Sequence, residues 1–354
     1  MLAANGQQRK RKDPIYTKND NVDPRLEELI HWLDQVPGFA GVELWPASVD
    51  ASFRRYFRVQ SGGQTRIVMD APPPQEDCRP FVQIAGILRA MGLNAPEVLQ
   101  ADLEQGFLLM SDLGQRQYLD ELEERPAAAD NLYQDAINAL RLMQIKGKPV
   151  EDSLSLYDES LLRSEVALFR DWLCAHHLGL NFSSEDAQRW SDCCDVLIAN
   201  AMAQPQSFVH RDYHSRNLML VDGNNPGILD FQDAVLGPFT YDLVSLLRDC
   251  YVRWPQEQVR DWALSFHSML ASATRHEVSS ELFLRYFDLT GIHRHLKAAG
   301  IFARLLHRDG KPGYMGDVPR TLQYIVDAGR NYPEMHFLVE LIETRCLPAL
   351  AVNQ

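Results

Sequence analysis

Three polar side chains in one short stretch have the types and spacing that phosphoryl transfer requires. Asp212 is followed five residues later by Asn217, and Asp230 comes thirteen residues after Asn217. In phosphoryl transfer a carboxylate accepts or orients the attacking hydroxyl, while a carboxamide and a second carboxylate hold the Mg²⁺ that neutralises the phosphates. We therefore predict that Asp212 is the catalytic residue and that Asn217 and Asp230 bind the metal and, through it, the nucleotide.

The segment between Asn217 and Asp230 predicts a hairpin that brings these two side chains together. Residues 218–221 and 227–231 have the pattern of short strands, and the intervening Asp-Gly-Asn-Asn-Pro has the composition of a turn. The whole pattern, H-x-D-x-x-x-x-N followed by L-D-F, is far more specific than an isolated H-R-D tripeptide. The stretch therefore indicates a phosphotransferase that uses Mg²⁺ and, by default, ATP.

The elements that would position this stretch predict an α+β protein with two parts. Periodicity and turn signals predict helices over residues 23–35, 79–91, 127–145, 158–177 and 185–203, and strands over residues 42–47, 54–60, 65–70, 98–99 and 107–110. This order places a small five-stranded antiparallel sheet before a larger, mostly helical part. We predict a disordered tail over 1–22, a nucleotide-binding lobe over 23–113 and a helical lobe over 114–354.

Composition excludes several classes of function. The chain has 35 basic and 48 acidic residues, and no basic run joins aromatic residues into a nucleic-acid footprint. No apolar stretch approaches the roughly 20 residues that span a bilayer. Six scattered cysteines without zinc spacing favour reduced thiols and a cytoplasmic protein. We expect neither a nucleic-acid partner nor a membrane partner, and no zinc site.

The catalytic stretch resembles the aminoglycoside phosphotransferase and choline kinase superfamily. The resemblance rests on His210–Asn217, on Leu229-Asp230-Phe231 and on Gly237–Leu243, and a histidine two places after the aspartate suits that superfamily better than protein kinases. It implies a bilobal, protein-kinase-like fold. It also implies a hinge over residues 110–114, so we expect Met110 and Asp112 to contact the nucleotide.

Three further stretches resemble bacterial kinases that phosphorylate the anomeric hydroxyl of N-acetylmuramate and N-acetylglucosamine. These stretches are residues 50–59, 69–73 and 305–311. The resemblance implies an amino-sugar substrate, a sugar α-1-phosphate product and a role in peptidoglycan recycling. Muramic acid carries a carboxylate, so we expect Arg308 and Lys311 to contact the substrate, together with Asp233 beyond the metal-binding hairpin.

One departure from the kinase pattern concerns the phosphate clamp. Kinase-like folds place a lysine on the third strand and pair it with a glutamate on the next helix. This chain has no lysine from Asn19 to Ile145, and the helix predicted over residues 79–91 has no glutamate. Since guanidinium groups also grip phosphate oxygens, we expect Arg54 and Arg55, ahead of Arg58, to bind the nucleotide in place of the lysine.

The neighbours of Asp212 leave several roles open. We expect His210 to brace the loop and Asp242 to accept backbone hydrogen bonds, whereas His214 could contact either the phosphate or the acceptor.

Two other functions compete with the amino-sugar kinase. One is an aminoglycoside or choline kinase, for which Trp172, Tyr251 and Trp254 could form an aromatic box around a cation. The other, suggested by the missing lysine, is a non-catalytic nucleotide-binding module. The retention of all three polar residues at the metal and the hydroxyl argues against that module.

Overall fold

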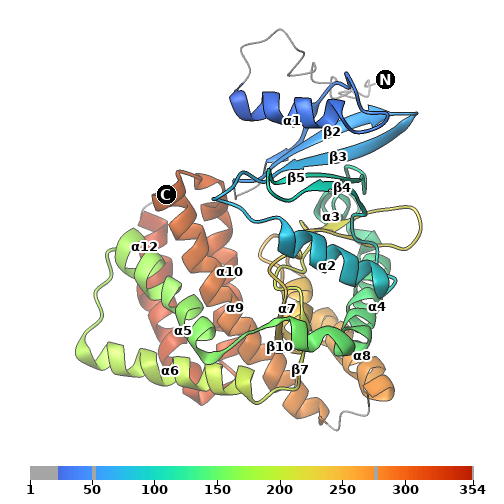
Figure 1. Ribbon diagram of the computed structural model, residues 1–354. Helices are drawn as coiled ribbons and strands as arrows, with labels where there is room; N and C mark the ends of the chain where they lie inside the picture. The colour runs from blue at the N-terminus through green and yellow to red at the C-terminus, as the bar shows by residue number, and fades with distance from the viewer. Residues whose placement is uncertain (1–22, 50–52, 275–277, 353–354) are drawn as a thin grey trace, which may run out of the picture. The chain divides into compact units, whose positions relative to one another are not determined.

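The chain divides into two compact units, each with its own core. A computed structural model describes residues 23–49, 53–274 and 278–352, and Figure 1 draws its helices and strands. One unit comprises the described residues up to Arg89 together with Ala95–Gly114, and the other comprises Ala90–Asn94 and the chain from Gln115 onward. The predicted tail, residues 1–22, lies outside the described residues.

The first unit is built on a five-stranded sheet in which every neighbouring pair is antiparallel. Its order is β1-β2-β3-β5-β4, with the strands β1 Trp45–Val49, β2 Arg55–Ser61, β3 Gln64–Asp70, β4 Val98–Asp102 and β5 Phe107–Ser111. The predicted class, a small antiparallel sheet followed by a helical part, is confirmed.

Helix α1, Pro24–Asp34, begins and packs as its sequence predicts. The side chain of Asp23 caps it by accepting the backbone N–H of Leu26 at 2.8 Å, and proline occupies the first turn. Its leucine stripe, Leu26, Leu29 and Leu33, is buried against sheet residues that include Phe57 and Val68. A second helix, α2 Arg79–Ala90, lies between β3 and β4 in the chain.

The first strand is shifted from the predicted 42–47 to Trp45–Val49. Gly38 and Gly41 have φ angles of 87° and 69°, so the turn after α1 continues through them. The backbone N–H of Val42 therefore bonds the carbonyl of Phe39 at 3.4 Å within this turn, and pairing with β2 begins only later.

The second unit is mostly helical, as predicted. Its α-helices are α3 Tyr118–Glu124, α4 Ala129–Gly147, α5 Glu159–Leu168, α6 Ser184–Met202, α7 Tyr241–Leu247, α8 Gln256–Thr274, α9 Ser280–Asp309, α10 Val318–Gly329, α11 His336–Leu341 and α12 Leu347–Val352. Shorter elements are a three-stranded sheet of β6 Ser155–Leu156, β10 Val235–Pro238 and β7 Gln206–Val209, and the hairpin of β8 Leu218–Met219 and β9 Gly227–Ile228.

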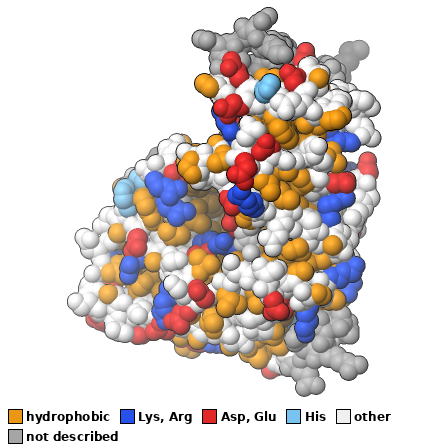
Figure 2. Space-filling view, in the orientation of Figure 1, with side chains coloured by type: hydrophobic (Ala, Val, Ile, Leu, Met, Phe, Trp, Pro, Cys, Tyr) orange, Lys and Arg blue, Asp and Glu red, His pale blue; other side chains and the backbone are white. Residues whose placement is uncertain are grey.

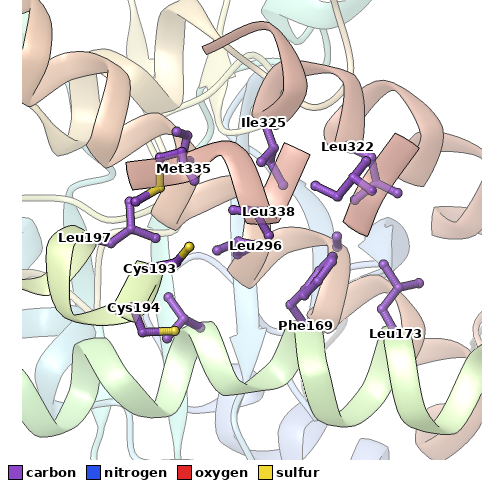
Figure 3. Packing of buried hydrophobic residues seen from close by; sticks show 14 of the residues in the cluster. Phe169, Leu173, Cys193, Cys194, Leu197, Leu296, Leu322, Ile325, Met335 and Leu338 are labelled. Atoms are coloured by element: carbon purple, nitrogen blue, oxygen red, sulfur yellow. The ribbon is translucent and has the colours of Figure 1, made fainter. Parts of the chain in front are cut away.

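Helix α9 is the centre of the helical unit, because it contacts α5, α6, α7, α8 and α10. Figure 3 shows part of the core around it, in which Leu296 lies among side chains from η3 Phe169–His177, α6, α10 and α11. The predicted helix over residues 158–177 is α5 continued by η3, which is a π-helical segment. Gly300 of α9 meets the junction of the two: a Cβ there would lie 2.3 Å from the carbonyl carbon of Leu168.

The charges on the surface are mixed in sign. On the face drawn in Figure 2, Lys and Arg side chains are interspersed with Asp and Glu. In the part of the chain that the structure describes, no helix combines the length and apolar character needed to cross a membrane.

Candidate active site

The catalytic loop begins where β7 ends, and a buried carboxylate holds its backbone. Asp242 of α7 accepts the backbone N–H of His210 at 2.6 Å and that of Arg211 at 2.9 Å. Burial raises the pKa of Asp242 to about 7, although both N–H donors favour its ionised form. Arg211 has a φ of 79°, so the two bonds also hold a strained turn. The predicted role of Asp242 is confirmed.

His210 braces the same loop from inside, as expected. Its Nδ1 accepts the backbone N–H of Asp212 at 3.3 Å, and its Nε2 therefore donates to the carbonyl of Leu229 at 3.0 Å. Burial lowers the pKa of His210 to about 4, so the ring is neutral at pH 7. The ring links the loop to Leu229, the residue directly after β9.

Asp212 is partly buried and lies among positive charges. Burial by itself raises the pKa of Asp212, but the charges of Lys297, His214, Arg294 and Arg211 outweigh it and hold this pKa below the usual value. The carboxylate is therefore ionised at neutral pH and can accept a proton from, or orient, a hydroxyl group.

Two of the cations beside Asp212, Lys297 and Arg211, belong to a buried network that the sequence did not reveal. The carboxylate of Glu165 in α5 forms two ion pairs, one with Lys297 Nζ of α9 at 3.0 Å and one with Arg211 Nη2 of the loop at 2.6 Å. Tyr157 also donates to Glu165, and Lys297 donates to the hydroxyl of Tyr241 at 3.2 Å. No local pattern in the sequence linked Glu165 to Lys297, because the two residues are 132 positions apart. The network fixes the positive charge that faces Asp212.

The predicted metal ligands lie side by side. Asn217 Nδ2 donates to the backbone carbonyl of Asp212 at 2.9 Å and to Asp230 Oδ2 at 3.2 Å. One carboxamide and one carboxylate are hard oxygen donors, and Mg²⁺ commonly takes only one or two protein groups and completes its shell with water and phosphate oxygens. The donor set fits Mg²⁺. Among the described residues no group of three or more His, Cys, Asp or Glu could hold a metal ion.

The hairpin that joins the two ligands has shorter strands and a longer connecting turn than predicted. Strands 218–221 and 227–231 shrink to two residues each, in β8 and β9. The backbone N–H of Val221 donates to the side-chain oxygen of Asn225 at 3.2 Å instead of to the opposite strand. On the other side, Asp230 has a left-handed φ of 60°, which ends strand pairing. Gln232 donates to Asp230 Oδ1 at 2.8 Å and so orients the carboxylate.

The three residues predicted to contact the substrate lie on two segments. Asp233 is exposed just beyond the hairpin, 3.5 Å from Gln232 Nε2. Arg308, in the last turn of α9, pairs with the adjacent Asp309 at 2.7 Å, and Lys311 follows the helix. Their contact with a substrate remains a prediction.

The rings considered for an aromatic box have separate surroundings. Trp172 stacks on His176 at 5.3 Å, and Trp254 donates to the hydroxyl of Tyr133 at 2.7 Å. Tyr251 instead lies 5.4 Å from His214, edge to face. Of the three, Tyr251 is thus the ring that contacts the catalytic loop.

In the first unit, the arginines expected at the phosphates are engaged by carboxylates. Arg55 Nη2 lies 2.6 Å from Asp70 Oδ2 and its Nη1 lies 2.6 Å from Asp23 Oδ2. Asp70 ends β3, is fully buried and also binds Arg25 at 2.9 Å. Arg54 Nε lies 3.8 Å from Glu76. The strand that carries the lysine in kinase-like folds therefore ends in a carboxylate paired with guanidinium groups. Nucleotide binding by Arg54 and Arg55 remains a prediction.

The predicted hinge residues have two different environments. Arg58 binds Asp112 in a two-pronged pair at 2.6 and 3.0 Å and also donates to the carbonyl of Gly114 at 2.9 Å. Met110 is buried on β5, opposite Ile67 of β3. Nucleotide contacts by Met110 and Asp112 remain predictions, and the pair with Arg58 gives Asp112 a structural role as well.

The sequence of this chain is similar to those of known phosphotransferases. A model of the phosphotransferase enzyme family matches residues 43–279. An N-acetylmuramate/N-acetylglucosamine kinase of Pseudomonas aeruginosa is 49% identical over 90% of this chain and 96% of its own length. A protein of the same name from Pseudomonas putida is 47% identical over the same shares.

A comparison with solved structures finds the same fold at much lower sequence identity. The GDP complex of aminoglycoside 2′-phosphotransferase-IIIa has a TM-score of 0.57 and 15% identity, and the match covers 88% of this chain and 100% of that one. An ethanolamine kinase of Plasmodium vivax also has a TM-score of 0.57, with 12% identity over 84% and 86% of the two chains.

Proposed function

The chain belongs to the phosphotransferase enzyme family, and we propose that it transfers the terminal phosphoryl group of ATP to the C1 hydroxyl of N-acetylmuramate and N-acetylglucosamine. The product is the α-1-phosphate of each sugar. The observation that carries the proposal is the arrangement of Asp212, Asn217 and Asp230 in a chain 49% identical to a kinase named for both sugars.

Asp212 orients the C1 hydroxyl and accepts its proton as the oxygen bonds to phosphorus. A sugar hydroxyl is a poor nucleophile at neutral pH, so positioning in line with the phosphoryl group contributes much of the rate. The lowered pKa keeps Asp212 ionised, which favours orientation of the hydroxyl over strong base catalysis. The anomeric hydroxyl is more acidic than other sugar hydroxyls and therefore suits a weak base.

Asn217 and Asp230 would hold the Mg²⁺ that accompanies the nucleotide. When bound, the ion supplies positive charge to the phosphate oxygens. The chain contributes the fixed spacing of the two donors, because Asn217 is tied to the backbone of Asp212 and Asp230 is oriented by Gln232. The two donors thereby keep a fixed position relative to the backbone of Asp212.

The proposal includes a biological setting. Sugar 1-phosphates of this kind feed nucleotide-sugar synthesis, so the enzyme returns cell-wall sugars to peptidoglycan precursors. We place the reaction in the cytoplasm, where ATP is available.

A ³¹P NMR spectrum of the full chain with ATP, Mg²⁺ and each sugar tests the proposal. We expect a new sugar 1-phosphate signal with the wild type and none with Asp212→Ala, while both proteins bind ATP equally. ATP that stays intact with both sugars would refute the amino-sugar assignment. Turnover with choline or an aminoglycoside instead would place the chain elsewhere in its family, and ATP binding without any turnover would indicate a non-catalytic module.

A further inference from the structure

Arg216 lies between the two functional ends of the catalytic loop, four residues after Asp212 and directly before Asn217. Its guanidinium carbon is 3.7 Å from the ring centre of Tyr251 and 5.7 Å from that of Tyr314. Across residues 23–49, 53–274 and 278–352, no hydrogen bond or ion pair engages this guanidinium. Aromatic faces hold the group in place, while its five N–H donors keep their capacity to bind an anion.

A buried carboxylate fixes the relation between Arg216 and the ring beneath it. Asp249, which is 2% exposed, accepts the backbone N–H of Ser215 at 2.9 Å and that of Tyr251 at 2.9 Å, one on each oxygen. The residue before Arg216 and the ring on which it stacks are therefore tied to one side chain. The position of the guanidinium is built into the fold, which lowers the entropy cost of binding a ligand.

The surroundings of Arg216 have the character of a small-molecule site. Tyr251 contacts the ring of Phe302 at 6.4 Å, and Phe302 stacks on Tyr314 at 5.7 Å. On the other side, Tyr251 contacts His214, whose Nδ1 is buried without a hydrogen-bond partner among the described residues. Aromatic walls with a few convergent polar groups are typical of ligand pockets.

Three other cations of the helical unit are paired with carboxylates. Arg211 and Lys297 bind Glu165, and Arg320 pairs with Asp317 at 3.3 Å. The charges that act most strongly on Asp212 are those of Lys297, His214, Arg294 and Arg211. Arg216 is absent from that set, and its charge acts instead on Tyr251 and Asp317.

We propose that Arg216 binds the carboxylate of the acidic acceptor sugar and thereby sets the preference for N-acetylmuramate over N-acetylglucosamine, which has no carboxylate. The inference rests on the proposed function. A guanidinium offers two parallel N–H donors that match the two oxygens of a carboxylate. Because this group of the sugar does not react, its binding affects KM and leaves kcat nearly unchanged.

Steady-state kinetics of Arg216→Gln with both sugars test the assignment. A lost charge-assisted pair corresponds to a rise of about 10- to 100-fold in KM for N-acetylmuramate. We expect kcat with that sugar, and both constants with N-acetylglucosamine, to stay within about twofold of the wild type. The matched control is Arg285→Gln: Arg285 also lies over a tyrosine, Tyr332 at 5.1 Å, but pairs with Glu334, and we expect no change for either sugar.

A second measurement needs no variant. The carboxamide analogue of N-acetylmuramate keeps the shape of the sugar but carries no charge, so the wild type should show the same rise in KM with the amide as Arg216→Gln shows with the acid. In a soluble Arg216→Gln protein, acid and amide should then have equal KM values.

Three results would overturn the assignment of Arg216. They are an equal rise in KM for both sugars, a fall in kcat with both, and wild-type KM values that are the same for acid and amide. In each case the wild type still phosphorylates both sugars, so the proposed function survives. Failure of the proposed function is a different result, namely no sugar phosphate from the wild type with either acceptor.

Discussion

Replacement of Lys297 by methionine tests whether the buried network both supports the fold and sets the charge at Asp212. Methionine keeps most of the apolar length of lysine and removes only the ammonium group. The side chains of Lys297 and Glu165 are 11% and 6% exposed, and their polar atoms are 3.0 Å apart. Breaking a buried pair costs about 3–5 kcal/mol. Since Arg211 remains bound to Glu165, we expect the lower end, about 3 kcal/mol.

Urea unfolding followed by tryptophan fluorescence measures this loss. Four of the six tryptophans, Trp172, Trp190, Trp254 and Trp262, belong to the helical unit, so the signal reports mainly on the unit that holds the network. The matched control is Arg163→Met, because Arg163 pairs with Glu159 and Asp195 on the surface, where a pair is worth at most about 1 kcal/mol.

The stability lost on replacement of Lys297 should depend on pH in a direction that follows from the pKa of Glu165. Burial raises the pKa of Glu165, but Lys297, His293 and Arg211 outweigh it and lower this pKa below 4.5. A lowered pKa contributes stability above the unfolded value, and this contribution is lost as the pH falls through the folded value. The deficit of Lys297→Met is therefore largest near neutral pH and shrinks on acidification below about 4.5.

The same substitution should change catalysis. The charge of Lys297 lowers the pKa of Asp212, so its removal should raise that pKa and move the acidic limb of the kcat/KM profile to higher pH. Two results together would refute the reasoning: a Lys297→Met protein whose free energy of unfolding falls by less than about 1 kcal/mol, and an unchanged acidic limb in its kcat/KM profile. Removal of a buried pair beside Asp212 should produce at least one of these effects.

Further substitutions test other parts of the structure. Asp230→Asn should raise the Mg²⁺ concentration for half-maximal activity while leaving the urea midpoint unchanged; an unaltered Mg²⁺ titration would exclude Asp230 as a ligand. Gly300→Ala should cost about 3 kcal/mol or more in urea unfolding, because its Cβ would lie 2.3 Å from the carbonyl carbon of Leu168; a loss below about 0.5 kcal/mol would contradict the close approach. Because the pKa of Asp242 is raised to about 7, the wild type should lose stability relative to Asp242→Asn as the pH rises from 3.8 to 7 and change little above that range. Parallel stability curves for these two proteins would show that Asp242 is ionised throughout.

The proximity of Asp212, Asn217 and Asp230 could be predicted from the sequence because these residues are close in the chain. Asp212, Asn217 and Asp230 lie within one loop and one hairpin. Their spacing in the sequence is therefore almost enough to predict that the three side chains lie close together. Capping of α1 by Asp23 followed from residue types alone. The start of β1 could not be predicted, because it depends on how far the turn through Gly38 and Gly41 extends.

Contacts between residues far apart in the chain could not be predicted from the sequence. Lys297 and Glu165 are 132 positions apart, and only the packing of α9 against α5 brings them together. The ion pairs of Arg55 were not predicted either, although the antiparallel register of β2 and β3 places Asp70 directly opposite Arg55. Nucleotide binding by Arg55 remains a prediction.

The reversed polarity at the end of β3 has a consequence for chemical labelling. Nucleotide analogues with an acylating or sulfonylating group mark many nucleotide-binding proteins by capturing a lysine amine near the phosphates. In this chain that strand ends in the buried carboxylate of Asp70, and no amine occurs on a side chain from Asn19 to Ile145. Such reagents would leave the sheet of the first unit unmodified. Surveys based on lysine capture would therefore not mark this protein at that strand, and an inhibitor designed around guanidinium and carboxylate groups would spare kinases that keep the lysine.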